Sequence, residues 1–362
     1  MEEGKTVMGM QQGAKAGESK EITIYDIARE AGVSPATVSR VLSSSTNVRQ
    51  EKKQRVLDLV DKYQFRPNAL ARGLADAKTR SIGMITADIR NPFYAEMLMS
   101  CELAAAEAGY VTYLCNAIKG KSQESMFLDR LKEQRVDVVI QIGGQVDEMV
   151  SDMTYVEKVN QIMKTIPVVT TGRLDGTKCR SVRIDAMKAM ELLMEHLLSL
   201  GHRHIGLVGG KLSVLSTYEK LVQYRQMLTE AGIAYDPDII MVDGAYTYSL
   251  EGGYEEMDQL LQKGKELTAV IAINDFTAAG VMHCLADHGI RVPEDISVVS
   301  YDNTYISEIT FPGITSIDYN YEEFGRKVVT AAIEAAQGVE GELLQIVSPS
   351  LVVRKSSGPA PR

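Results

Sequence analysis

From residue 81 onward, short runs of apolar and β-branched residues alternate regularly with segments whose apolar residues recur at helical spacing. This alternation constrains the fold strongly, because strands separated by helices predict parallel sheets joined by crossover helices. We therefore expect a doubly wound α/β architecture for residues 81–362. The seven predicted strands are 82–86, 111–114, 136–140, 167–170, 205–208, 267–271 and 296–300.

A faint internal repeat indicates that this region contains two similar lobes. The strings Arg80-Ser81-Ile82-Gly83 and Arg203-His204-Ile205-Gly206 each begin a predicted strand, and a long helical segment follows each. In both copies Glu-Ala-Gly ends that helix, and Gly109 and Gly232 each lie 26 residues after the glycine of the strand. Two doubly wound lobes side by side would form a cleft at the carboxyl ends of their strands, where ligands usually bind.

Three short amphipathic helices are predicted in residues 22–67, after a tail of residues 1–21 that lacks periodicity and is expected to be flexible. The first helix is expected to end at Gly32, because glycine readily takes the left-handed conformation, and Ser34-Pro35 can begin the second. Two short helices joined by such a turn form a helix-turn-helix. From the spacing alone, an ordinary helical hairpin with a solvated face is an equally good interpretation.

The charge distribution separates this head from the rest of the chain. The whole chain has a formal net charge of −9, but residues 22–80 carry 11 basic and 6 acidic side chains, a net charge of +5. Residues 81–362 have the opposite balance, with 25 basic and 38 acidic side chains. A small basic module on a large acidic body is typical of a nucleic-acid-binding unit joined to a unit with another role.

The residues of the head also match a known signature over a long ungapped stretch. TIYDIAREAGVSPATVSRVL at residues 23–42 closely resembles the N-terminal signature of the lactose-repressor (LacI/GalR) family of bacterial transcription regulators. RPNALARGL at 66–74 is similar to the family's hinge segment, and the resemblance extends over residues 22–355, including an effector core of periplasmic-binding-protein-like type. The resemblance implies a sequence-specific DNA-binding regulator, a repressor, whose operator affinity is controlled allosterically by a small ligand.

Candidate DNA contacts follow from the helix-turn-helix and from the resemblance. The second helix should turn small side chains and Arg40 outward, and arginine can contact guanine through two hydrogen bonds. Residues 68–80 resemble the family's hinge helix and linker, in which Leu74 aligns with a leucine that wedges between base pairs in the minor groove. Without the resemblance, this stretch is better interpreted as a plain linker whose leucines pack on the body. The candidate DNA-binding residues are Thr23, Tyr25, Ser34, Pro35, Ala36, Thr37, Ser39, Arg40, Asn47, Arg49, Asn68, Ala71 and Leu74.

Residues near the ends of predicted strands are the candidate effector contacts. Asp302 aligns with the family's ligand-binding aspartate and Asn274 with its hydroxyl-binding asparagine, although both residue types also cap turns. Lys220 stands where many relatives carry arginine, and lysine lacks the planar hydrogen-bonding fork of arginine. The candidate effector-binding residues are Phe93, Tyr94, Arg173, Lys220, Asn274 and Asp302. They predict an uncharged or cationic polyhydroxylated effector, a mono- or oligosaccharide.

The same sequence leaves alternatives open. Lys132–Asp137, Gly143-Gly144 and Asp302-Asn303-Thr304 resemble the catabolite-control branch of the family, in which a phosphorylated carrier protein drives the core between its states. The body alone would also suit a sugar-binding transport protein, which the helix-turn-helix and the lack of a signal peptide disfavour. An enzyme is not expected, because the chain has no Walker loop, GxSxG elbow or Rossmann GxGxxG motif.

The remaining expectations concern cofactors, partners and location. No cofactor or metal is expected, because the four cysteines form no CxxC pair and His202-Arg203-His204 has no neighbouring ligand cluster in the sequence. The expected partners are a near-palindromic double-stranded operator and a second copy in a homodimer, or a dimer of dimers, joined through the helical segment from Tyr94 to Ala108. The sequence has no membrane-spanning apolar run, and we expect a cytoplasmic, nucleoid-associated bacterial protein.

Overall fold

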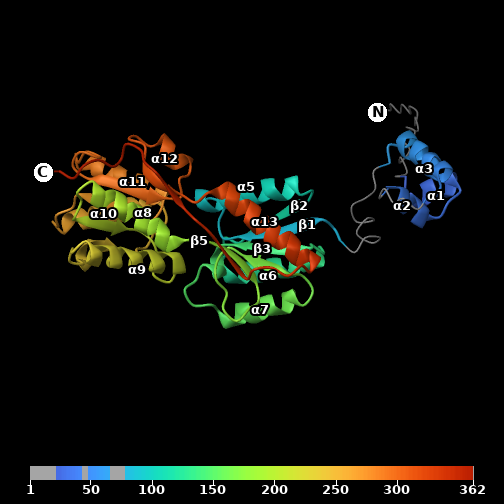
Figure 1. Cartoon of the computed structure of the whole chain (residues 1–362), viewed down its shortest axis with the longest axis horizontal. Helices are drawn as coiled ribbons and strands as arrows, with labels where there is room; N and C mark the ends of the chain where they lie inside the picture. The colour runs from blue at the N-terminus through green and yellow to red at the C-terminus, as the bar shows by residue number, and fades with distance from the viewer. Residues whose placement is uncertain (1–21, 43–47, 66–77, 362) are drawn as a thin grey trace, which may run out of the picture. The chain divides into compact units, whose positions relative to one another are not determined.

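The structure, a computed structural model of the whole chain, describes residues 22–42, 48–65 and 78–361. The chain divides into two compact units, Met1–Thr79 and Arg80–Arg362, which are both drawn in Figure 1. The expected flexible tail and most of the expected hinge helix lie outside the described residues. Among the described residues, no helix is both long enough and apolar enough to cross a membrane.

The predicted end of the first helix at Gly32 and the predicted start of the second at Ser34-Pro35 are confirmed. The described helices of the first unit are α1 (Ile24–Ala31), α2 (Pro35–Leu42) and α3 (Gln50–Lys62). Thr23 begins α1 with a reciprocal capping box: its hydroxyl accepts from the Asp26 N–H at 3.4 Å, and the Asp26 carboxylate accepts from the Thr23 N–H at 3.1 Å. Gly32 ends α1 in the left-handed conformation, with φ of 65°. The Ser34 hydroxyl accepts from the Thr37 N–H at 3.2 Å, which caps the start of α2.

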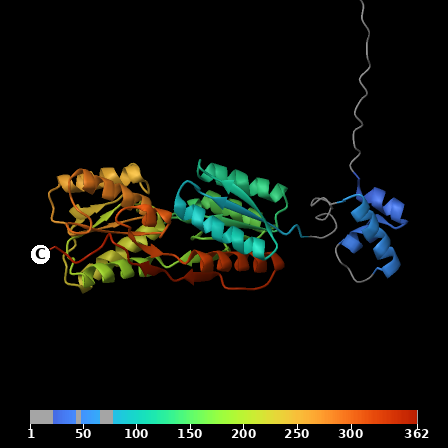
Figure 2. The same cartoon turned by 90° about the horizontal axis from the view of Figure 1, so that it is seen from above.

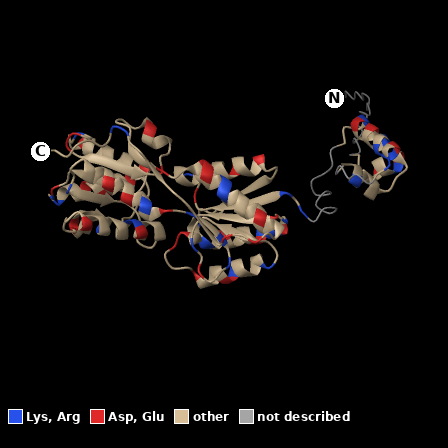
Figure 3. Cartoon of the chain, viewed as in Figure 1, with Lys and Arg blue, Asp and Glu red and all other residues tan. Residues whose placement is uncertain are grey.

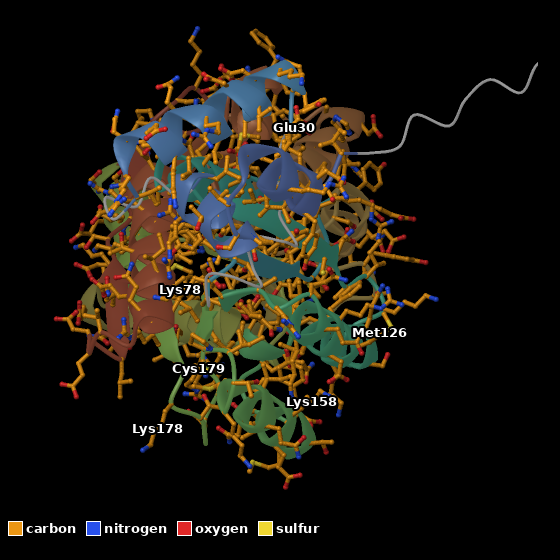
Figure 4. The ribbon with its side chains drawn as sticks, turned by 90° about the vertical axis from the view of Figure 1, so that its right-hand side faces the viewer. Glu30, Lys78, Met126, Lys158, Lys178 and Cys179 are labelled. Carbon is orange, nitrogen blue, oxygen red and sulfur yellow. The ribbon has the colours of Figure 1, made fainter. Side chains whose placement is uncertain are left out.

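A small apolar core holds the helices of the first unit together. Its buried residues are Ile27, Ala28, Ala31, Val38, Val41 and Val56. Glu30, labelled in Figure 4, joins α1 to the end of α3, because its carboxylate accepts hydrogen bonds from Lys62 Nζ and Tyr63 Oη, both at 2.7 Å. With Val38 and Val41 buried, α2 is fixed against its neighbours and its opposite side faces outward.

The second unit consists of two α/β lobes, which Figures 1 and 2 show from two directions. The sheet of the first lobe has the order β11-β5-β4-β3-β1-β2, and its pairings are all parallel over the described residues. Its strands are β1 (Ser81–Thr86), β2 (Val111–Asn116), β3 (Val138–Ile142), β4 (Val168–Thr170), β5 (Arg180–Ile184) and β11 (Leu344–Val347). Its helices are α5 (Pro92–Glu107), α6 (Lys121–Glu133), α7 (Met153–Met163) and α13 (Tyr321–Gln337).

The sheet of the second lobe has the order β12-β10-β9-β8-β6-β7, with β12 antiparallel to β10 and the other pairings parallel. Its strands are β6 (Ile205–Val208), β7 (Ile240–Met241), β8 (Ala269–Ala272), β9 (Ser297–Tyr301), β10 (Thr315–Asp318) and β12 (Ser350–Val352). Its helices are α8 (Ala186–Ser199), α9 (Leu215–Glu230), α10 (Leu250–Gln262), α11 (Asp275–Asp287) and α12 (Tyr305–Ile309). Separate apolar clusters pack on the two faces of each sheet, as expected for doubly wound lobes.

The chain does not complete one lobe before it enters the other. Within the described residues 80–361 it passes from β5 into α8, from β10 into α13 and from β11 into β12. The late elements α13 and β11 therefore complete the first lobe, and Figure 1 shows α13 in orange-red beside the green and cyan elements of that lobe. The seven predicted strands are confirmed to within about two residues, whereas β5, β7, β10, β11 and β12 were not predicted.

Candidate functional site

The predicted DNA contacts that the structure describes lie on α2 and around the starts of α1 and α3. Thr23, Tyr25, Ser34, Ala36, Arg40 and Arg49 are exposed, and Pro35, Thr37 and Ser39 are half-buried. Tyr25 has 70% of its surface exposed, so its aromatic ring is not needed for packing in the core of this unit. The other predicted contacts, Asn47, Asn68, Ala71 and Leu74, lie outside the described residues.

The electrostatics of the first unit favour an anionic partner. Figure 3 marks lysine and arginine residues in blue along its helices, with acidic residues in red among them. The carboxylates of Asp26, Glu30 and Glu51 each pair with a basic side chain, at 2.6–3.1 Å. Arg40 and Arg49 add exposed positive charge on and next to the helices. A surface with this excess of basic groups attracts nucleic-acid phosphates.

A cavity of about 270 Å³ lies between the two lobes of the second unit, lined by residues of both. Small-molecule sites commonly have volumes of roughly 300–1,000 Å³, so this cavity is at the small end and suits a single ring better than a chain of rings. Predicted effector residues that line it are Phe93, Tyr94, Lys220, Asn274 and Asp302.

Aromatic rings form part of the cavity wall. The ring centroid of Phe93 lies 5.1 Å from that of Tyr94 and 5.7 Å from that of Tyr319, the latter in an edge-on arrangement. Phe93 also packs against the apolar clusters of both lobes. An apolar ring among polar groups can cover the apolar face of a sugar while those groups bind its hydroxyls.

Tyr94 has a buried partner that was not predicted. Its hydroxyl donates to Asp147 Oδ2 at 2.8 Å, and burial raises the pKa of the Asp147 carboxyl to about 6. Asp147 follows the tight turn at Gly143-Gly144, where a Cβ on Gly143 would lie 2.4 Å from the Tyr94 ring. The signal available in the sequence was this glycine pair at the carboxyl end of β3, the edge at which cleft residues of parallel sheets gather.

Asp302 and Lys220 are two buried ionisable side chains that influence each other's pKa. Lys220 Nζ lies 3.7 Å from the Tyr301 ring centroid and donates to Tyr319 Oη at 3.3 Å. Burial raises the pKa of Asp302 strongly, nearby Asp275 acts in the same direction, and the Lys220 charge opposes both. Burial lowers the pKa of Lys220 to about 8, against the effect of Asp302. Because each charge is costly without the other, the pair favours a ligand that adds no net charge.

The turn that carries Asp302 is held by a second buried carboxylate. Asp302 has a φ of 95°, a conformation that L residues rarely adopt. Asp275, at the start of α11, accepts hydrogen bonds from the Thr304 N–H at 2.7 Å and from the hydroxyls of Ser300 and Ser316 at 2.5 and 2.8 Å. These bonds fix the 302–304 turn in place, so Asp275 positions the cavity residue without lining the cavity itself.

Asn274 both lines the cavity and caps a helix. It lines the cavity, and its side-chain oxygen accepts from the Thr277 N–H at 2.8 Å as the N-cap of α11. Its side-chain nitrogen donates to the Tyr248 carbonyl at 3.3 Å. The cap therefore fixes the orientation of the amide that a ligand in the cavity would meet.

Direct contacts join the two lobes beside the cavity. The Met149 N–H donates to the Ser213 carbonyl at 2.6 Å, and the Leu215 N–H donates to the Asp147 carbonyl at 2.8 Å. An ion pair at 2.9 Å connects Arg183 of β5 to Glu219 of α9. The lobes are therefore closed on each other around the cavity, and opening them requires breaking these bonds.

Arg173 does not line the cavity, in contrast to its predicted contact with the effector. Its guanidinium donates to the Met149 carbonyl at 2.5 Å, and its Nε lies 3.2 Å from Asp175 Oδ2. Both partners are groups of the first lobe. Arg173 thus supports the loop that contacts the second lobe. The preceding residue, Gly172, lines the cavity instead.

Comparisons with known proteins agree with this division into a head and a two-lobed body. Residues 23–68 match the family described as "Bacterial regulatory proteins, lacI family", and residues 194–357 match the "Periplasmic binding protein-like domain". The chain is 36% identical to catabolite control protein A of Priestia megaterium over 299 residues, which cover 82% of this chain and 87% of the relative. It is 30% identical to the HTH-type transcriptional regulator DegA of Bacillus subtilis over 346 residues, 93% of this chain and 98% of the relative.

Solved structures show the same likeness. The structure of the lac repressor dimer bound to operator and the anti-inducer ONPF has a TM-score of 0.82 and 28% sequence identity to this chain. The match covers 94% of this chain and all of that one. Both the head and the body therefore have counterparts in a single DNA-bound protein.

Proposed function

The chain belongs to the LacI family of bacterial regulatory proteins, and from that premise we propose that it is a repressor controlled by a small neutral carbohydrate bound between its lobes. A ligand-controlled DNA-binding regulator of this family needs one element that contacts the operator and one that senses the ligand. Here these are the helix-turn-helix of α1 and α2 and the cavity of the second unit. We also propose that it acts in the cytoplasm, at the nucleoid, because a repressor works where its operator DNA lies.

The observation that carries the proposal is the lining of the cavity. The lining combines aromatic rings, which match the apolar face of a sugar ring, with the Asn274 amide and the Asp302 carboxyl, which match its hydroxyl groups. The paired charges of Lys220 and Asp302 disfavour a strongly charged ligand. The small volume favours a monosaccharide over the oligosaccharide that the sequence also allowed.

A screen that compares ligand classes tests the proposal. The operator is first selected from random DNA by binding to the full chain, and monosaccharides, disaccharides and nucleosides are then tested for their effects on the melting temperature and on operator Kd. We expect one monosaccharide or a few related ones to raise the melting temperature. The same sugar should change operator Kd by roughly 5- to 150-fold, because typical allosteric couplings are about 1–3 kcal/mol. A response to nucleosides or disaccharides alone would contradict it.

Asp302→Asn should uncouple the sensor from DNA binding. Asparagine tolerates the positive φ at this position, so the turn should keep its shape while the carboxylate is lost. We expect the effector to lose most of its influence on operator Kd, with effector-free operator binding within about twofold of the native chain. Fluorescence anisotropy with labelled operator measures both values. Asp287→Asn, an exposed change on α11, is the matched control and should leave the response intact.

Arg40→Ala should weaken operator binding by about 1–3 kcal/mol and random-DNA binding much less. Arg40 is exposed on α2, the helix that the fold leaves facing outward, and a guanine contact would be lost only on the specific site. Parallel titrations of operator and random duplexes at one salt concentration give the comparison. Equal losses on both duplexes would assign Arg40 to a phosphate contact instead.

We further propose that two copies associate through exposed apolar residues of both lobes. Leu103 on α5 is 57% exposed, and Phe311, just after α12, is 94% exposed. The segment from Tyr94 to Ala108 was the predicted interface, and the lac repressor is described as a dimer. Leu103→Glu should weaken self-association at least about tenfold in analytical ultracentrifugation. Val150→Glu, at an apolar position that is 78% exposed on a loop of the first lobe, should not change the sedimentation behaviour.

A second candidate is control by a phosphorylated carrier protein in place of a free sugar. The observation that favours it is the 36% identity to catabolite control protein A, together with the motifs at 132–137, 143–144 and 302–304. If no sugar changes the melting temperature or operator affinity while a phosphorylated carrier protein strengthens operator binding, this candidate replaces the first. If the unphosphorylated carrier has the same effect, phosphorylation is not the signal.

A further inference from the structure

Three side chains of different metal-binding types converge on the helix pair α10 and α11 of the second lobe, and none of them lines the cavity. They are Asp258 on α10, Cys284 on α11 and His288 immediately after α11, and one donor atom from each lies within 4.8 Å of the others. Cys284 Sγ is 3.8 Å from His288 Nδ1, and His288 Nε2 is 3.3 Å from Asp258 Oδ1. We use the name α10–α11 cluster for these three residues.

The close approach of the two helices brings the cluster together. A Cβ on Gly280 would lie 1.9 Å from the Leu250 carbonyl oxygen, and one on Gly253 would lie 2.1 Å from the Thr277 carbonyl oxygen. The helices therefore meet backbone to backbone at these glycines. Further along the pair, side chains that point toward the partner helix necessarily face each other at short range. Cys284 and His288 are four residues apart, so both can point to the same side of the α11 end.

The ring of His288 is oriented as metal-binding histidines usually are. Its Nδ1 lies 2.9 Å from the Cys284 carbonyl oxygen, so that the Nδ1–H donates to the backbone and Nε2 is directed toward Asp258. In protein metal sites, the ring nitrogen that does not bind the ion typically makes such a bond. Asp258 is held in the same way, because its other oxygen accepts from Gln262 Nε2 at 2.6 Å. Two of the three candidate ligands thus have a supporting hydrogen bond.

We propose that the α10–α11 cluster binds one divalent transition-metal ion of the zinc class through Asp258, Cys284 and His288. A thiolate, an imidazole and a carboxylate form a donor set that suits Zn²⁺ and Co²⁺ and does not suit Mg²⁺ or Ca²⁺, which prefer oxygen ligands alone. Three protein ligands leave a fourth position for water or another ligand. Binding requires the Cys284 thiol and His288 Nε2 to give up any proton they carry and the three donors to move closer together.

The ion would clamp the ends of two helices that contribute to the sensing lobe. Its ligands come from both helices, so it adds a cross-link that the unfolded chain lacks and stabilises the folded state by mass action. The opposite end of α11 begins at Asn274, which lines the cavity. The site lies apart from the proposed carbohydrate cavity, so the two proposals stand or fall separately.

Cobalt titration of the full chain tests the proposal. The protein is first treated with EDTA to remove bound metal. We then expect one Co²⁺ per chain to produce a near-ultraviolet thiolate-to-cobalt band and the visible bands of tetrahedral Co²⁺. Added Zn²⁺ should displace the Co²⁺ and abolish both sets of bands. Zn²⁺ should also raise the melting temperature. Cys284→Ser should abolish the near-ultraviolet band, and Asp258→Asn and His288→Gln should each weaken binding. Gln262→Ala removes only the supporting bond and should weaken binding by roughly 10-fold.

Control variants keep the result unambiguous. His283→Gln changes an exposed histidine on the same helix and Cys179→Ser changes a half-buried thiol of the other lobe, and both should leave the cobalt bands intact. Circular dichroism checks that each variant is folded, and His288→Gln, on the exposed end of α11, provides a fold-neutral test if Cys284→Ser is unstable. The absence of a thiolate-to-cobalt band in the native chain, its survival in Cys284→Ser, or an unchanged Co²⁺ affinity in His288→Gln would overturn the proposal.

Discussion

Gly280→Val is expected to destabilise the second lobe by about 3 kcal/mol or more, because the new side chain would collide with backbone atoms. A Cβ at Gly280 would already lie 1.9 Å from the Leu250 carbonyl oxygen and 2.8 Å from the Tyr254 nitrogen. Neither atom can move unless α10 shifts as a whole. Since Asn274 caps α11 and Asp275 on the same helix accepts a hydrogen bond from the 302–304 turn, the shift should also disturb the cavity.

Urea denaturation followed by circular dichroism measures the effect of Gly280→Val on the free energy of unfolding. Ala286→Val is the matched control, because it adds a branched side chain to an exposed position of the same helix. The control should cost less than about 1 kcal/mol, mostly through helix propensity. If the two variants were equally stable, the backbone contact between α10 and α11 would not be as close as the structure shows.

Glu256→Gln is expected to stabilise the protein at pH 8 by up to about 2–3 kcal/mol and to have little effect near pH 4.5. Burial raises the pKa of Glu256 from its ordinary 4.5 to about 7, and Asp243 acts in the same direction. Between these two pH values the folded chain binds a proton that the unfolded chain has released. The free energy of unfolding therefore falls as the pH rises from about 4.5 to 7, because the buried Glu256 must ionise. Above pH 7 this loss of stability stays constant.

Thermal or urea unfolding of Glu256→Gln and native protein across pH 4.5–8 tests this sign. The difference between the two curves isolates Glu256, because other buried carboxyls with raised pKa values, such as Asp147, are present in both proteins. Glu255→Gln, an exposed change at the preceding position, should give a difference close to zero throughout. A stability difference that is independent of pH would mean that Glu256 has the same pKa in the folded and the unfolded protein.

Local sequence patterns were sufficient for the elements with strong periodicity. The strands β1, β3, β6, β8 and β9 are buried along most of their length, so they appear in the sequence as apolar runs that need no knowledge of their neighbours. In contrast, β5 has the sequence RSVRI and β10 the sequence TSID, and both contain several polar residues. These segments form strands because neighbouring strands pair with them, which a local pattern does not reveal. The return of the chain into the first lobe depends on contacts between residues more than a hundred positions apart, and no local pattern encodes it.

The cavity residues divide in the same way. Asp302 directly follows β9, and Asn274 is the second residue after β8. Both therefore lie at the carboxyl ends of predicted strands, which is how the sequence indicated them. Asp147 and Arg183 come from a loop and from an unpredicted strand, and their positions depend on how the lobes close. Arg173 directly follows Gly172, which reaches the cavity wall, but adjacency in the sequence does not determine the direction of a side chain. The carbonyl of Met149 and the carboxylate of Asp175 direct it away from the cavity.

The late arrival of β11 has a consequence for how this protein is made. During synthesis the first lobe can begin to fold once β5 has emerged, yet its sheet cannot be completed until β11 emerges about 160 residues later. At 5–20 residues per second this delay is roughly ten to thirty seconds. The DNA-binding head is synthesised first and has a core of its own, so it can fold well before either lobe is whole. Each new molecule thus passes through an interval in which its head can already be folded while the lobes that enclose the cavity are still incomplete.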